Sequence, residues 1–234
     1  MGIRPIDIAK KLGITTSALK HYEKWGIVPP AERAPNGYRV YTEEHAAYFE
    51  CIRAMFPGFG VDVTKKVMVK LQEREVDEAL WIVSEVQARL QQDKILAERT
   101  IRILDTEQLD IVVDARGRKK ELTIGDVAAE TGVPTSAIRH WEKEGILNLP
   151  RDQDNGYRKF DDAQIRQIMI IRILRSANYP LEVIKDVLQE LEHHHVHNAR
   201  RVLKDTLVYL NYRNHNQMRG VHYLYQLCRV LKLV

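Results

Sequence analysis

The fold of this 234-residue chain is decided by a stretch that the chain carries twice. Residues 7–27 read DIAKKLGITTSALKHYEKWGI, and residues 126–146 read DVAAETGVPTSAIRHWEKEGI. Asn-Gly-Tyr-Arg follows each stretch, at residues 36–39 and 155–158. At an offset of 119, residues 4–39 and their counterparts share 15 identities in 36 positions without a gap. The chain therefore contains two copies of one small domain.

Each copy predicts a helix-turn-helix followed by a β-hairpin. In the first copy, Pro5 suits the first position of a helix, and Gly13 suits its end. Thr15 or Thr16 can cap a second helix. The Asn-Gly pair at residues 36–37 is a strong signal for a tight hairpin, so a two-stranded wing is expected after the helix pair.

Two further helices are expected after the wing, over residues 43–56 and 63–72 in the first copy. Residues 57–60, Pro-Gly-Phe-Gly, should break the chain between them. The second copy repeats the same order, with helices over residues 162–176 and 181–191. The fold class is therefore mainly α, with two winged helix-turn-helix domains.

A long helix is predicted after each copy. Residues 78–107 are rich in helix formers and would extend about 45 Å. In the C-terminal segment, which is to be helical, basic and coiled-coil-like, a heptad seam with a polar middle favours helix pairing. The alternatives are one amphipathic helix on a core, or two helices broken near Asn214. The seam consists of Leu203, Leu207, Leu210, Asn214, Gln217, Val221, Leu224, Cys228 and Leu231.

The expected domain organisation follows from these elements. A first winged-helix domain (1–76) is followed by a long helix (77–108) and a linker (109–121). A second winged-helix domain (122–192) precedes the C-terminal helical segment (193–234).

Composition and charge set the broad class. The chain is 44% hydrophobic and 29% charged, which is typical of a soluble globular protein with a real core. The net charge is only +4, but residues 198–234 hold seven bases and one acid. A local basic face favours a polyanionic partner. No apolar run is long enough to span a bilayer and no signal peptide is recognisable, so a cytoplasmic, nucleoid-associated protein without a membrane partner is expected.

The second helix of a helix-turn-helix lies in the major groove of DNA, so double-stranded DNA is the expected partner. Lys20 and Arg139 occupy the same position of the two predicted recognition helices, and both residue types reach guanine edges or phosphates. For any one candidate, the alternative is a solvated surface residue, and for Tyr22 and Trp141 it is packing in the core. The full set of expected DNA contacts is Thr16, Ser17, Lys20, His21, Tyr22, Tyr38, Arg39, Thr135, Ser136, Arg139, His140, Trp141, Tyr157 and Arg158.

The repeated stretch and its Asn-Gly-Tyr-Arg resemble the N-terminal winged-helix domain of the MerR family of transcription regulators. The resemblance covers residues 3–75 and 122–192. It implies a bacterial regulator that binds a promoter and distorts its DNA to alter access of RNA polymerase. It also implies DNA contact by Lys20, Tyr22, Tyr38 and Arg39, and by Arg139, Trp141, Tyr157 and Arg158. The family commonly carries an aromatic pair in the recognition helix, and here His21 or His140 stands in the place of the first aromatic.

Members of that family ordinarily have one DNA-binding domain per chain and act as homodimers through antiparallel helices. This chain carries two such domains. We therefore expect a single-chain pseudo-dimer in which residues 78–107 pack against residues 200–231. A homodimer with four winged helices is the alternative.

No enzyme motif is present, so neither catalysis nor a cofactor is expected. Cys51 and Cys228 are interpreted as core or seam thiols, because two cysteines make neither a disulfide framework nor a thiolate cluster. His193 and His197 are one helical turn apart and form a weak candidate pair of metal ligands, the alternative being a solvated junction.

Two other functions stay open at this point. One is an architectural or chromosome-organising DNA protein that senses no ligand. The other is a regulator whose second winged helix binds protein, because Asp152, Asp154, Asp161 and Asp162 surround that wing. Sequence selectivity should separate these functions, since an architectural protein shows a steep salt dependence and little preference among sequences.

Overall fold

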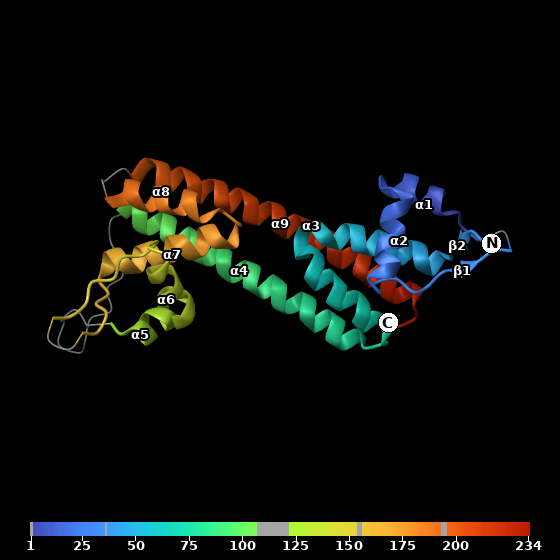
Figure 1. Ribbon diagram of the computed structural model, residues 1–234, viewed down its shortest axis with the longest axis horizontal. Helices are drawn as coiled ribbons and strands as arrows, with labels where there is room; N and C mark the ends of the chain where they lie inside the picture. The colour runs from blue at the N-terminus through green and yellow to red at the C-terminus, as the bar shows by residue number, and fades with distance from the viewer. Residues whose placement is uncertain (1, 36, 107–121, 154–155, 193–195) are drawn as a thin grey trace. The chain divides into compact units, whose positions relative to one another are not determined.

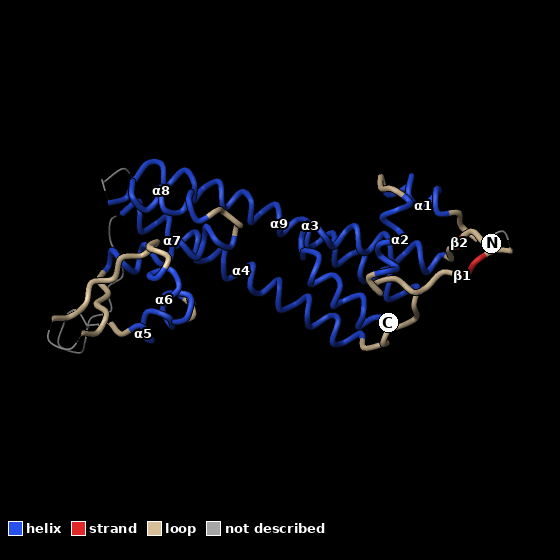
Figure 2. The backbone as a smooth tube through the Cα atoms, in the orientation of Figure 1, coloured by secondary structure: helices blue, strands red, loops and turns tan. Residues whose placement is uncertain are grey.

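The computed structural model of the chain describes residues 2–35, 37–106, 122–153, 156–192 and 196–234. Most of the described chain is helical, and its strands form one small hairpin (Figures 1 and 2). The mainly α fold expected from the sequence is confirmed. No helix in these ranges is both long enough and apolar enough to cross a membrane.

The chain forms two compact units. Unit 1 consists of Met1–Gln91 and Asn211–Val234, and unit 2 consists of Gln92–Leu210. Each unit therefore holds one of the two repeated domains and a part of each of the two long helices.

The helix pair of unit 1 forms as expected. Helix α1 (Pro5–Leu12) begins with Pro5 and ends at Gly13, which adopts a left-handed φ of 63° and donates its N–H to Ala9 and Lys10 carbonyls. Helix α2 (Thr16–Lys24) is capped by Thr15, whose Oγ1 accepts from the Ala18 N–H at 3.2 Å. The side chains of Leu19 and Tyr22 pack into the core from α2.

The wing of unit 1 is a short antiparallel hairpin. Strands β1 (Glu32–Arg33) and β2 (Arg39–Val40) pair Glu32 with Val40 and Arg33 with Arg39. Gly37 closes the turn by donating its N–H to the Ala34 carbonyl at 2.8 Å, with a φ of 80° that favours glycine. The predicted hairpin is confirmed in this copy.

Helix α3 (Glu43–Gln72) joins the two helices that were expected after the wing. Thr42 and His45 form a capping box at its start. The helix is interrupted at Gly60, whose φ of 79° and ψ of 171° are not helical. The predicted break is therefore present as a kink within one helical segment.

Unit 2 repeats the helices of unit 1 but not the strands. Its domain consists of α5 (Ile124–Thr131), α6 (Thr135–Lys143), α7 (Asp162–Ser176) and α8 (Leu181–Glu192). The expected second β-hairpin is reduced, in the described residues, to a single bridge between Arg151 and Arg158.

Proline explains the difference between the two wings. Lys159 donates its N–H to the Pro150 carbonyl at 2.8 Å, and Asp152 donates to the Tyr157 carbonyl at 2.7 Å. Pro150 therefore occupies the position of Glu32 in β1, but it has no N–H to return a ladder bond. The offset between the copies is accordingly 118, not 119, along the first side of the wing.

The long helices α4 (Val76–Thr106) and α9 (Val196–Val230) each contribute to both units. In unit 1, Leu224, Leu227 and Cys228 of α9 share one core with Ala79 and Val83 of α4 and with the winged-helix domain. The segment 196–230 is one helix without a break near Asn214, and the heptad residues are buried or half-buried except Asn214, which is exposed. The expected linker lies outside the described residues.

Burial in α4 recurs in α9 at an offset of 120. The two helices share little sequence, yet they bury equivalent positions along most of their length. The buried pairs are Ala79 and Ala199, Val83 and Leu203, Leu90 and Leu210, Ala97 and Gln217, Thr100 and Gly220, and Leu104 and Leu224. The structural repeat therefore extends beyond the winged-helix domains into the long helices.

Candidate nucleic-acid interface

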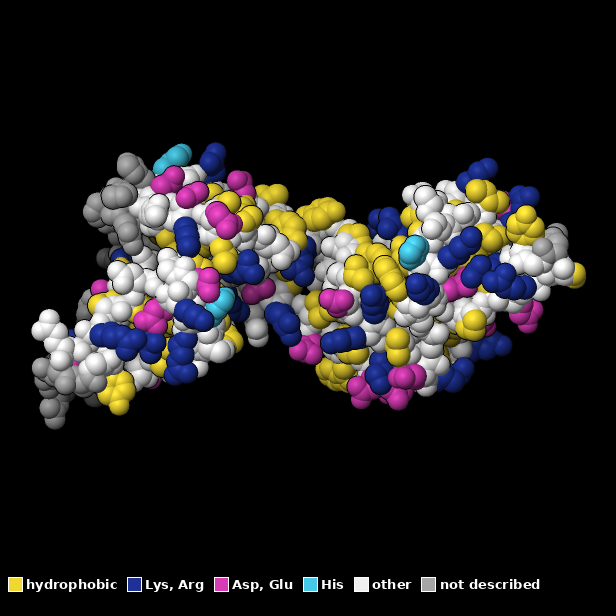
Figure 3. Space-filling model, in the orientation of Figure 1, with side chains coloured by type: hydrophobic (Ala, Val, Ile, Leu, Met, Phe, Trp, Pro, Cys, Tyr) yellow, Lys and Arg dark blue, Asp and Glu magenta, His cyan; other side chains and the backbone are white. Residues whose placement is uncertain are grey.

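In unit 1, a groove of about 740 Å³ lies between the start of α1, helix α2 and the wing. Among the described residues, its lining includes four cations, Arg4, Lys20, Arg33 and Arg39, and no acid. Lys and Arg side chains gather over α2 and the wing on the face shown in Figure 3. The groove therefore suits an anionic ligand.

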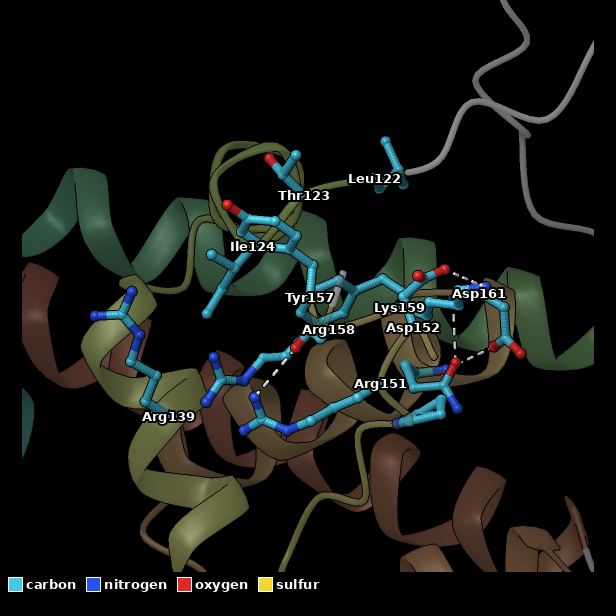
Figure 4. A pocket seen from close by; sticks show the side chains of 14 residues that line it. Leu122, Thr123, Ile124, Arg139, Arg151, Asp152, Tyr157, Arg158, Lys159 and Asp161 are labelled. Atoms are coloured by element: carbon cyan, nitrogen blue, oxygen red, sulfur yellow. Dashed lines mark hydrogen bonds and ion pairs between the residues drawn. The ribbon is translucent and has the colours of Figure 1, made fainter. Parts of the chain in front are cut away.

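Unit 2 has an equivalent groove of about 800 Å³, between the start of α5, helix α6 and the second wing. Figure 4 shows Arg139 on α6 at one side of this groove, and Arg151 and Lys159 on the wing at the other. Asp152 and Asp161 also line it. The two repeated domains thus present the same concave surface, although with different charges.

Lys20 and Arg139 occupy the same position of α2 and α6, and neither is bound by another side chain of the described residues. Each side chain is exposed and follows a fully buried residue, Leu19 or Ile138, which anchors the helix in the core. Within the part of the chain that the structure describes, neither side chain has a hydrogen bond or an ion pair. Both cations are therefore available to an external acceptor.

Arg39 and Arg158 are engaged within the protein. The Arg39 Nε lies 2.8 Å from the Glu23 carboxylate, and the Arg158 Nη2 lies 2.6 Å from the Glu142 carboxylate. The Tyr41 hydroxyl also donates to Glu23. The hydrogen bond to Glu23 raises the pKa of Arg39, and burial raises the pKa of Tyr41. These contacts fix each wing against its recognition helix.

Glu23 and Glu142 were not among the residues expected at the site. They are half-buried acids at the same position of α2 and α6. Their identity in the two copies was the available signal, because a carboxylate retained on a DNA-facing helix needs a cationic partner.

The remaining expected residues divide between surface and core. Tyr38 and Tyr157 stand at the wing tips and are 73% and 75% exposed. Tyr22 and Trp141 are only 6% and 8% exposed, which confirms the alternative that they pack in the core. Ser17, His21, Ser136 and His140 are exposed on the recognition helices, and Thr16 and Thr135 are half-buried at the helix starts.

One difference between the recognition helices was also missed. Trp25 follows α2, and the Lys65 amine lies over its ring, 4.2 Å from the ring centroid. The equivalent residue of unit 2 is Glu144, whose carboxylate lies 4.0 Å from the His140 Nδ1. The two units therefore differ in charge just beyond their recognition helices.

The thiols and histidines give no metal site in the described residues. Cys51 and Cys228 are buried in the core of unit 1, as expected, and burial raises the pKa of both thiols. His197 is exposed, and His193 lies outside the described residues. No group of three or more potential ligands occurs among the residues that the structure describes.

Comparison with known proteins identifies both repeats. A family model described as MerR family regulatory protein matches residues 4–41, and one described as MerR HTH family regulatory protein matches residues 122–191. No solved structure matches the chain.

Several curated relatives match over a short region. The HTH-type transcriptional regulator CueR of Salmonella typhi is 42% identical over 57 residues, which are 24% of this chain and 41% of that protein. AdhR of Bacillus subtilis (strain 168) is 39% identical over 49 residues, 21% of this chain and 35% of that protein. The nodulation protein NolA of Bradyrhizobium sp. (strain NC92) is 32% identical over 71 residues, 30% of each chain. The chain thus spans less than half the length of these relatives. The chain therefore contains two regions of MerR type, one in each unit.

Proposed function

We propose that this protein is a sequence-specific DNA-binding transcription regulator that places α2 and α6 in the two halves of one operator. The observation that carries the proposal is the pair of unengaged cations, Lys20 and Arg139, at the same position of two equivalent grooves. A recognition helix reads base edges through side chains of this kind, whereas a wing contacts the backbone.

The relatives support this proposal through their printed names. CueR and AdhR are named as HTH-type transcriptional regulators, and they match 57 and 49 residues of the chain. In the proposed complex, the exposed Ser17, His21, Ser136 and His140 contact DNA beside the two cations. Tyr38 and Tyr157 contact the backbone from the wings. The bound promoter is distorted, which changes access of RNA polymerase.

We also propose that one chain acts as a pseudo-dimer. Two observations support it: each unit contains parts of both long helices, and burial along α4 recurs along α9. In this proposal, residues 1–76 and 122–192 are the two reading domains. Residues 77–108 and 193–234 take the place of the two dimerisation helices, and residues 109–121 join the halves.

The first test is the affinity of alanine variants for an operator selected from random DNA. Lys20→Ala and Arg139→Ala should each weaken operator binding by about 1–3 kcal/mol, because each removes one base or phosphate contact. The controls are Lys66→Ala and Lys185→Ala, which remove one charge each from α3 and α8 outside the grooves described above. The controls should bind the operator like the wild type.

The same experiment can reject the proposal. If the wild type binds random DNA as tightly as any selected sequence, with a steep salt dependence, the protein is architectural rather than a regulator of specific promoters. If only Arg139→Ala is silent, unit 2 does not read DNA, and its acid-containing groove then fits a protein partner better.

The mass of the free protein and of its DNA complex tests the pseudo-dimer. A species of 27.2 kDa that binds one site of roughly 20 base pairs would agree with it, because half-sites lie about one helical turn apart. A free protein of twice that mass would contradict it and favour the homodimer with four winged helices.

A further inference from the structure

The two grooves are built on the same frame but carry different reading residues. Ser17 and Ser136, and His21 and His140, are identical across the units. The ion pairs of Arg39 with Glu23 and of Arg158 with Glu142 fix the wings in the same way. The recognition helices therefore present Lys20 and Arg139 from the same position, so that a difference in reading arises at the side chains themselves.

Lysine and arginine read DNA differently at such a position. The lysine ammonium is a compact charge with rotatable donors, so it can donate hydrogen bonds to acceptors in many arrangements. The arginine guanidinium is a planar fork that pairs with the O6 and N7 atoms of guanine through two parallel hydrogen bonds. Arg139 can therefore fix one base, whereas Lys20 tolerates several.

The charges around the two residues differ in the same direction. Four cations and no acid line the groove of unit 1 among the described residues; Arg4 and Arg39 pair with Asp7 and Glu23, which leaves Lys20 and Arg33 without an ion pair there. In unit 2, the Lys159 amine lies 2.7 Å from Asp152, and Arg151 lies 3.6 Å from Glu142. Ion pairing within the protein lowers the attraction of these cations for phosphate. Unit 1 is thus the stronger phosphate binder, and phosphate contacts carry no sequence information.

We infer that the two units read unequal half-sites: unit 2 requires a guanine opposite Arg139, and unit 1 binds its half chiefly through phosphates. This inference rests on the proposed function. The operator is then asymmetric, and because both units belong to one chain, the protein sits on it in a single orientation.

The test is selection from random DNA with the full-length wild type, Lys20→Arg and Arg139→Lys, followed by sequencing. The wild type should select sites in which a guanine is fixed in one half and the equivalent position of the other half varies. Arg139→Lys should relax the fixed position alone, by roughly tenfold in the preference for guanine. Lys20→Arg should add a guanine preference to the other half and make the operator more symmetric.

Lys24→Arg and Lys143→Arg are the matched controls. These lysines occupy equivalent exposed positions at the ends of the two recognition helices, and neither lines a groove. The selected sequences should not change in either control.

The outcomes separate this inference from the proposed function. Selection of a symmetric operator by the wild type, or equal relaxation of both halves by Arg139→Lys, would overturn the unequal reading and leave the regulator intact. No enrichment of any sequence by the wild type would overturn both. A guanine that moves between halves as arginine is moved between the units would establish the inference.

Discussion

One glutamate on each recognition helix fixes the shape of each groove. Glu23 accepts hydrogen bonds from Arg39 and Tyr41, which lie in and directly after the second strand of the wing. Glu142 accepts two from Arg158, while Phe160 stands in the place of Tyr41 and cannot donate. Both pairs are largely shielded from water: the Arg39 and Glu23 side chains are 26% and 12% exposed, and those of Arg158 and Glu142 are 23% and 21% exposed. Their role is to hold the wing, so their effect on DNA is indirect.

Glu23→Gln should therefore destabilise unit 1 more than the loss of a surface ion pair does. Glutamine keeps an acceptor but loses the charge, and it leaves the half-buried Arg39 without its counter-ion. We expect a cost of about 1–3 kcal/mol, between that of an exposed and that of a buried pair. The measurement is denaturant unfolding of the Trp141→Phe background, in which tryptophan fluorescence comes from Trp25 and Trp81 of unit 1.

The control for this variant is Asp7→Asn, made in the same Trp141→Phe background. Asp7 pairs with Arg4 at 2.8 Å, and both side chains are largely exposed. A surface pair of this kind contributes little, so the midpoint of unfolding should stay where it is. Equal effects of the two substitutions would show that Glu23 does not fix the wing.

The crossing of α3 and α9 within unit 1 depends on glycine and on one buried amide. A Cβ at Gly58 would lie 2.6 Å from the backbone nitrogen of Gln217, and a Cβ at Gly220 would lie 2.9 Å from the Phe59 ring. The Gln217 Nε2 donates to the Gly58 carbonyl at 3.1 Å. The kink at Gly60 interrupts the helix at this point, and such a break leaves carbonyls that need other donors. Gln217 supplies one, which explains a polar residue in the buried seam.

The sequence predicted these elements but not their crossing. The periodicity and the glycines located α3, its kink and the heptad seam with Gln217 at its polar middle. The favoured partner of that seam was the other long helix, with packing on a core as an alternative. The contact with Gly58 joins residues 159 positions apart, and nothing local in either segment signals it.

Three glycine-to-alanine substitutions should separate close packing from helix propensity. Gly58→Ala should cost about 1–3 kcal/mol in unit 1, because the backbone of α9 must move to make room. Gly220→Ala should cost less, because its nearest neighbour is a ring edge that can shift. Gly125→Ala, at the start of α5, should stabilise unit 2 by up to about 1 kcal/mol, since the nearest atom lies 3.6 Å away.

Denaturant unfolding measures these effects. Gly58→Ala and Gly220→Ala are made in the Trp141→Phe background, where Trp25 and Trp81 report on unit 1, and Gly125→Ala is made with Trp25 and Trp81 replaced by phenylalanine, where Trp141 reports on unit 2. Within unit 1, the wild type should be the most stable, followed by Gly220→Ala and then Gly58→Ala. Within unit 2, Gly125→Ala should be more stable than the wild type. If Gly58→Ala were neutral, α9 would not approach α3 as closely as described.

At the scale of the whole molecule, the repeat is more complete in burial than in sequence. The winged-helix copies share identities because their surfaces and turns demand particular residues. The long helices share buried positions but not residue types, so Ala97 corresponds to Gln217 and Thr100 to Gly220 without any recognisable similarity. The sequence therefore predicted two domains and two long helices, but it could not assign parts of each helix to both units. Likewise, Pro150 was visible in the sequence, but its effect on the second wing depended on a register that the turn alone did not specify.

Because α9 contributes to both units, substitutions along this one helix should destabilise different winged helices. Leu224 and Leu203 are both fully buried, the first in unit 1 and the second in unit 2. Leu224→Ala should cost about 2–5 kcal/mol and act on the winged helix that precedes it by more than 150 residues in sequence. Hydrogen exchange measured by mass spectrometry should show faster exchange in α1–α3 and unchanged exchange in α5–α8. Leu203→Ala should give the reverse, and Val208→Ala, at a position 67% exposed, should change neither. If Leu224→Ala accelerated exchange equally in all these helices, the two units would unfold as one, and the division of α9 between two independent cores would be wrong.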